Sequence, residues 1–136
     1  MRSALRIAVI VTALAVPAAT LAAGTGTGKT YAINCLREQY KPTAIVLACG
    51  DGGILVQELK WSHWSRTQAV ASGNFVWNDC KPSCVKGHFH ARTVKITLSG
   101  PKACPGHAHR AFGRAAFTYP DGGPPFMFRR TTFPCP

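Results

Sequence analysis

Four of the five histidines form two His-x-His pairs, and these pairs have the spacing most suited to chemistry. They are His88 with His90 and His107 with His109. Residues two apart in an extended strand project from the same face, so each pair would present two imidazole rings side by side. Paired imidazoles are the beginning of a copper or zinc site.

A four-histidine site would require the two pairs to meet, and the expected hairpin keeps them apart. If Ala91–Leu98 pairs with His109–Tyr119, Leu98 lies opposite His109 and His90 lies about 26 Å further along, at about 3.3 Å per residue. We therefore expect solvated loop histidines and neither a metal ion nor another cofactor. A metal-handling protein that uses the two pairs separately is kept as an alternative.

Trp61 and Trp64 are candidate binding residues because aromatic rings with a polar edge are typical of sugar-stacking sites and interfaces. Residues three apart in a strand point to opposite faces. This spacing predicts one tryptophan in the core and the other half-covered by a loop.

The chain is strongly basic, with 16 Lys and Arg against 5 Asp and Glu and a formal net charge of +11. Removing Arg2 and Arg6 with the leader described below leaves 14 basic residues and a net charge of +9. The charge is spread along the chain, and such a surface attracts polyanions over long range. We expect an anionic cell-envelope polymer or surface as the partner.

Arg129 and Arg130 are the adjacent basic pair and are taken as candidate binding residues. With Phe126 and Phe128 they come nearest to the mixture of basic and aromatic residues found in nucleic-acid sites. The same charges would also protect an edge strand from unwanted pairing. We expect no specific nucleic-acid recognition.

No catalytic residue is assigned, because the sequence contains no G-x-S-x-G, no H-E-x-x-H and no obvious carboxylate pair. The available acids are Glu38, Asp51, Glu58, Asp79 and Asp121. Three of them lie in turn contexts, where an aspartate usually bonds its own backbone. Since active sites assemble in three dimensions, a small secreted hydrolase is kept as a second alternative to a binding module.

The glycine-rich segment from Gly24 to Thr30 superficially resembles a nucleotide-binding loop. It is one residue too short for G-x-x-x-x-G-K-[ST], and no strand precedes it. We interpret residues 23–30 as a flexible N-terminus of the mature protein.

The first 22 residues have the features of a signal peptide. Arg2 and Arg6 form a positive start, Ile7–Val16 is apolar, and Thr20-Leu21-Ala22 is a small-x-small cleavage site. The apolar stretch is shorter than the roughly 20 residues that a membrane span requires. We expect export, cleavage after Ala22 and no membrane span.

Six cysteines in a short exported chain indicate a disulfide framework. Six cysteines allow 15 complete pairings, and the spacing favours one set of three pairs. For the CxxxC formed by Cys80 and Cys84, a zinc or redox site is the alternative. The favoured pairs are Cys35–Cys49, Cys80–Cys84 and Cys104–Cys135.

Short alternating segments dominate residues 31–136 and predict a single β domain. Thr93–Leu98 places Val94, Ile96 and Leu98 on one face. The other β-rich runs are Ala44–Ala48, Ile54–Trp64, Thr67–Asn78 with Ala69, Ala71, Gly73, Phe75 and Trp77 on one face, and Ala111–Tyr119 with Ala115, Phe117 and Tyr119 on one face. Glycine- and proline-rich turns separate the runs, and Asn34–Tyr40 alone has the potential for a turn or two of helix. We expect a small all-β sandwich or barrel of six to eight antiparallel strands.

The last hairpin supports the Cys104–Cys135 pair. If the turn is centred between Gly122 and Gly123, the numbers of two residues that face each other add up to about 245. This register brings Cys135 beside Arg110. The loop 102–109 then needs only to fold back to place Cys104 within the roughly 5.5–6 Å Cα spacing of a disulfide.

Three short elements together resemble small secreted actinobacterial proteins of unknown function. They are Leu47-Ala48-Cys49-Gly50-Asp51-Gly52, Trp61-Ser62-His63-Trp64 and Cys80-Lys81-Pro82-Ser83-Cys84, within Ala44–Leu98. The resemblance implies no activity and assigns no site residue. With the basic charge, it leads us to expect a secreted, noncatalytic, extracellular or cell-envelope binding module.

Overall fold

The computed structural model describes residues 28–126 and 128–136. The predicted signal peptide and most of the predicted flexible segment lie outside these residues. Thr30, which we had placed in that segment, is instead the first residue of a strand and is 1% exposed. Its hydroxyl donates a hydrogen bond to the Arg66 carbonyl oxygen at 2.8 Å, which explains its burial.

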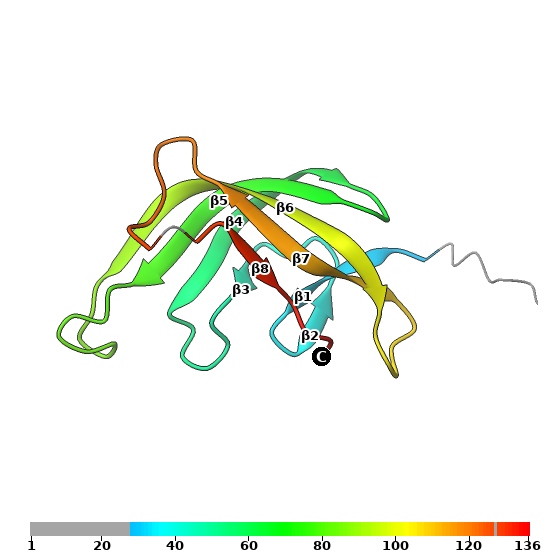
Figure 1. The fold of residues 1–136 in the computed structure, drawn as a ribbon, viewed down its shortest axis with the longest axis horizontal. Coiled ribbons are helices and arrows are strands. Elements are labelled where there is room, and N and C mark those ends of the chain that lie inside the picture. Colours follow the sequence, from blue (N-terminus) through cyan, green and yellow to red (C-terminus); the bar gives the residue numbers. More distant parts are fainter. Residues whose placement is uncertain (1–27, 127) are drawn as a thin grey trace, which may run out of the picture.

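Eight strands make up the described chain, which confirms the all-β prediction. They are β1 (Thr30–Asn34), β2 (Arg37–Gln39), β3 (Ile45–Val46), β4 (Ile54–Trp64), β5 (Ala69–Asn78), β6 (Phe89–Ala103), β7 (Arg110–Thr118) and β8 (Arg130–Thr132). The strand order is β2-β1-β7-β6-β5-β4-β3, and β8 pairs with β7. This single sheet curls into a half-barrel, in which the long strands β4 to β7 arch over the shorter ones (Figure 1).

One strand pair departs from the predicted antiparallel arrangement, because β1 runs parallel to β7. The pairing is short, joining Thr30 to Arg110 and Tyr31 to Ala111. No tight turn connects β1 to β7, so hairpin geometry does not determine their relative direction.

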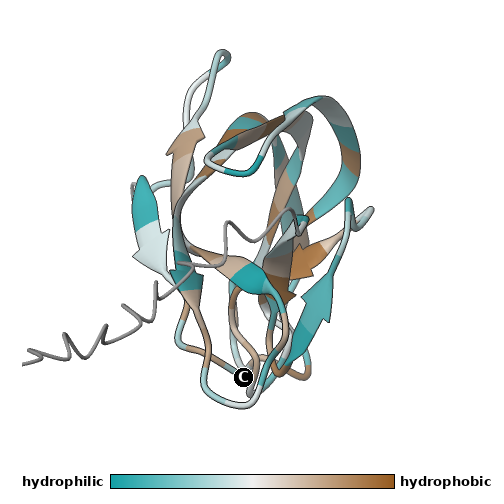
Figure 2. Ribbon diagram, turned by 90° about the vertical axis from the view of Figure 1, so that its right-hand side faces the viewer, coloured by the Kyte–Doolittle hydropathy of each residue, from teal (hydrophilic) through white to brown (hydrophobic). Residues whose placement is uncertain are grey.

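Hydrophobic residues alternate with polar ones along the strands, which bend around one interior (Figure 2). The predicted inward faces are confirmed: Val94, Ile96 and Leu98 are at most 1% exposed. Phe75 is fully buried and lies against the rings of Trp77 and Phe117. The concave side of the sheet is therefore the core, and the convex side carries the intervening polar residues.

The segment Asn34–Tyr40 forms no helical turn, in contrast to our expectation. It is the tight connection and second strand of the β1–β2 hairpin, in which Ile33 faces Glu38. Cys35 adopts a φ of 55° at the turn, outside the helical region. The alternation of buried and exposed residues was too short here to reveal a strand.

Asn34, at the end of β1, connects the two ends of the curled sheet. Its side-chain amide nitrogen donates to Gln39 Oε1 at 2.8 Å and to the Ala44 carbonyl at 3.2 Å. Its side-chain oxygen accepts from the Val46 backbone N–H at 2.9 Å. A side chain thus satisfies the edge of β3, where a continuous barrel would have another strand.

The three favoured disulfides are all present, Cys35–Cys49, Cys80–Cys84 and Cys104–Cys135. The predicted final hairpin is also confirmed to within one residue, since Arg114 faces Thr132 and facing numbers sum to 246. This register carries Cys135 next to the end of β6, where Cys104 is buried. Closing that loop contributes about 3–4 kcal/mol in the chain-entropy model.

Candidate binding surfaces

The two tryptophans lie on the same side of the sheet, not on opposite faces as predicted. Their ring centroids are 4.5 Å apart, with the planes at 81°. The pairing of β4 with β5 shifts register between Trp61 and His63, which marks a β-bulge. The extra residue reverses the alternation, so both rings turn toward the core.

The polar edges of both indoles are used within the protein. Trp61 Nε1 donates to the Pro42 carbonyl at 2.8 Å, and Trp64 Nε1 donates to the Thr30 carbonyl at 3.0 Å. Both side chains are half-buried and pack against the core. They connect β4 to the strand and loop that close the half-barrel, which is a structural role.

A small pocket beside Trp64 combines aromatic and basic groups. Tyr40 meets the Trp64 ring edge-on at 5.2 Å, and Lys29 Nζ lies 4.8 Å from the centre of the Tyr40 ring. The pocket has a volume of about 190 Å³. It is too small for more than a single small group, and Lys29 already covers the Tyr40 face.

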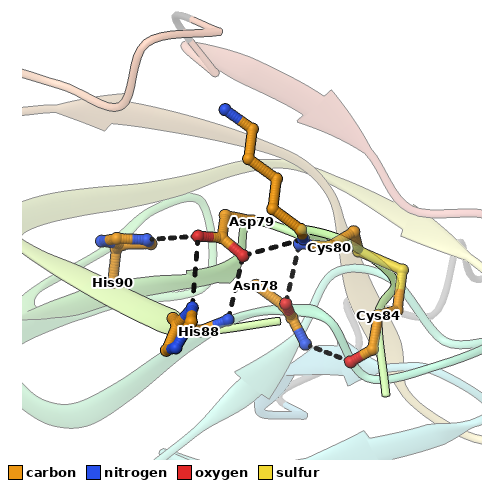
Figure 3. Close-up of polar contacts among 7 residues, drawn as sticks. Asn78, Asp79, Cys80, Cys84, His88 and His90 are labelled. Carbon is orange, nitrogen blue, oxygen red and sulfur yellow. Dashed lines mark hydrogen bonds and ion pairs between the residues drawn. A yellow bond between two sulfur atoms is a disulfide. The ribbon is translucent and has the colours of Figure 1, made fainter. Parts of the chain in front are cut away.

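The two His-x-His pairs lie at opposite ends of β6, His90 within its first residues and His107 after its last, so the structure does not bring the four histidines together. His88 and His90 face Asp79, which directly precedes the loop closed by the Cys80–Cys84 disulfide (Figure 3). His90 Nε2 is 3.1 Å and His88 Nδ1 is 3.8 Å from Asp79 Oδ2. Sequence reasoning did not anticipate this carboxylate partner.

Asp79 is held firmly in its charged form. Its Oδ1 accepts backbone N–H bonds from His88 at 2.9 Å and from Lys81 at 3.0 Å. The His88 N–H, then the His90 ring, then the Lys81 N–H hold the pKa of this carboxyl far below its usual range. The carboxylate is thus engaged in fixing the loop.

The second pair has a different carboxylate environment. His107 Nδ1 lies 3.3 Å from Glu38 Oε2, while the buried Glu38 Oε1 has no hydrogen-bond partner. His109 stacks on Tyr31 with 4.5 Å between ring centres. Each pair therefore has one carboxylate, and no group of three or more potential metal ligands occurs in the part of the chain that the structure describes.

Among the described residues, four of the five carboxylates have a hydrogen-bond or ion-pair partner, whereas no carboxylate pairs with Lys60, Lys95, Arg114 or Arg130. Asp51 accepts from the Gly53 N–H and Glu58 from the Asn74 amide, in addition to the partners of Asp79 and Glu38 given above. Between described residues, the ion pairs all join a carboxylate to a histidine.

Four exposed basic residues point outward from four different strands. We call them together the convex basic face: Lys60 of β4, Lys95 of β6, Arg114 of β7 and Arg130 of β8. Lys60 and Lys95 both face Ser72 across β5, so they lie in one row about 10 Å apart.

Of the predicted pair, Arg130 is the first residue of β8 and Arg129 lies just before the strand. The Arg129 carbonyl accepts from the Phe117 N–H at 2.9 Å, and Arg130 opens β8 opposite Ala116. Arg130 instead shares a surface groove with Arg114, which our sequence analysis did not single out. The predicted register of the last hairpin could have identified this pair, because it places Arg114 opposite residue 131, next to Arg130.

No family model, no curated protein and no solved structure matches this chain. The resemblance noted from the short motifs therefore stays a prediction. Within the described residues, no helix is long and apolar enough to cross a membrane.

Proposed function

We propose that the protein is a noncatalytic binding module of the extracellular space or cell envelope that holds anionic polymers on its convex basic face. The observation that carries the proposal is the contrast between engaged carboxylates and unpaired cations. The acidic side chain nearest to this face in sequence, Glu58, is hydrogen-bonded to Asn74 at 2.7 Å.

The form of the face supports a polymer as the ligand. Its cations are spread over β4, β6, β7 and β8, and the exposed hydroxyls of Ser72 and Thr118 lie directly beside Lys95 on the two neighbouring strands. A chain with repeated negative groups can contact several such positions at once and release its counterions. The three disulfides indicate an oxidising compartment, where envelope polymers are found.

The concave aromatic residues support this choice by their own contacts. An aromatic sugar-binding site needs rings open to the ligand, whereas Trp61 and Trp64 have their indole N–H groups bound to carbonyls inside the protein. Electrostatic attraction to the convex basic face is the better-supported mode of binding.

The test removes two charges from the face and two from elsewhere. Lys60→Gln/Lys95→Gln removes one row of the face, and the control Lys81→Gln/Lys86→Gln removes two exposed lysines from the disulfide loop region. Affinity for an immobilised anionic polymer at low salt is measured by biolayer interferometry. We expect a loss of about tenfold or more for the face variant and a much smaller loss for the control.

Two results would contradict the proposal. Equal losses in both variants would show that net charge alone attracts the polymer. A wild-type protein that binds no anionic polymer at low salt would rule out the function altogether.

A further inference from the structure

A surface groove across β6, β7 and β8 is lined by two arginines of the convex basic face, Arg114 and Arg130. Its volume is about 560 Å³. The lining residues are Ser99, Arg114, Ala115, Ala116, Arg130, Thr131 and Thr132. None of these is acidic, so an anion entering the groove meets no like charge.

The strand register places the two arginines on one face. Arg130 lies opposite Ala116, and Arg114 lies two residues before Ala116 on the same side of β7. Diagonal neighbours of this kind lie about 7–8 Å apart. Two long side chains at that spacing can both contact one small anion, because the alanine between them leaves the space open.

Hydroxyl groups flank Arg114 on both neighbouring strands. Ser99 of β6 and Thr132 of β8 are each its direct cross-strand partner. The residues that line the groove thus carry hydrogen-bond donors from three strands, two guanidinium groups and the hydroxyls of Ser99, Thr131 and Thr132.

Gly100 leaves room for the Arg114 side chain. It has a φ of +62°, and a Cβ built on it would lie 2.6 Å from Arg114 Nε. The guanidinium therefore lies directly against the glycine backbone, in space that any side chain at position 100 would fill. The Arg114 side chain thus extends over β6, on the side of the groove that Ser99 lines.

We propose that this groove is a subsite for a tetrahedral oxyanion group of the polymer, a phosphodiester or a sulfate ester. A planar carboxylate is satisfied by one guanidinium fork, whereas the oxygens of a tetrahedral group point in several directions and can accept from both arginines and the flanking hydroxyls. The inference rests on the proposed function and names the chemistry that its ligand carries.

The experiment compares three polymers with two matched variants at one salt concentration. The polymers are polyglycerol phosphate, dextran sulfate and polygalacturonate. The variants are Arg114→Gln/Arg130→Gln and the charge-matched control Lys81→Gln/Lys86→Gln. For the phosphate or the sulfate polymer, we expect the affinity of the groove variant to be at least about tenfold lower than the affinity of the control variant. The loss for polygalacturonate should match the control more closely, and the polymer that loses most identifies the oxyanion.

A single-residue pair sharpens the test. Arg130→Gln should weaken binding of the preferred polymer more than Arg129→Gln, although both remove one exposed charge from neighbouring positions. Circular dichroism verifies that every variant is folded.

The possible outcomes distinguish a failure of this inference from a failure of the proposed function. If the wild type binds all three polymers and the groove variant behaves like the control, the subsite is overturned while the proposed function stands. An equal loss for polygalacturonate would overturn the tetrahedral specificity. Failure of the wild type to bind any of the three polymers would remove the proposed function itself.

Discussion

The concave and convex faces of the same strands differ sharply in what their side chains do. Along β6, Val94 and Ile96 are at most 1% exposed, whereas Lys95 between them is exposed. The concave rings contact one another and close the half-barrel, while the convex cations have no carboxylate partners among the described residues. The comparison indicates that one face is committed to folding and the other is available for a ligand.

The largest expected effect is on the concave face. Phe75→Ala should lower the free energy of unfolding by about 3–5 kcal/mol, because the ring is fully buried among other rings and its removal leaves a cavity. The matched convex substitution Lys95→Gln should change stability by less than about 0.5 kcal/mol. Urea denaturation followed by fluorescence measures both, and a comparable loss in the two variants would contradict the division of roles.

Trp64 gives an intermediate effect and a test of the structural role of the indoles. Trp64→Phe removes the N–H bond to the Thr30 carbonyl and part of the packing on Phe112, so we expect a loss of about 1–3 kcal/mol in stability. Polymer affinity of the folded variant should remain within about twofold of wild type, since the proposed binding depends on the cations of the convex basic face. A large loss of affinity without a loss of stability would place the ligand at the tryptophan instead.

The strand pattern was predictable where burial follows strict alternation over several residues. This held for β5, β6 and β7, whose inward residues the sequence identified. It failed at Trp61 and Trp64, because a β-bulge changes which face a residue occupies without leaving any clear mark in a single sequence.

The contacts at the candidate sites were likewise predictable only in part. The disulfides and the last hairpin follow from turn chemistry and register, and that register places Arg114 near Arg130. By contrast, the Glu38–His107 contact joins residues far apart in the chain through the β1–β7 pairing, for which no local signal exists.

The smallest expected effect concerns Asp79, which lies on neither face. Its pKa is lowered in the folded state, so the unfolded state takes up the proton first on acidification. The stability that Asp79 contributes is therefore complete above its ordinary value near 3.8 and is lost as the pH falls below it toward the folded-state pKa. Asp79→Asn should be less stable than wild type at pH 7, and the difference should shrink below about pH 4. A difference that stays constant from pH 7 to about pH 2 would show that the charge is not the cause.

The most direct test of the central claim is the salt dependence of wild-type binding to a flexible anionic polymer. If the four cations of the convex basic face each contact one negative group, the logarithm of the association constant should fall linearly with the logarithm of salt concentration. The expected slope is about −3, from roughly −0.7 per contact. Measurement between about 50 and about 200 mM salt covers the range where such losses are large. Binding that persists with a slope near zero would contradict the account.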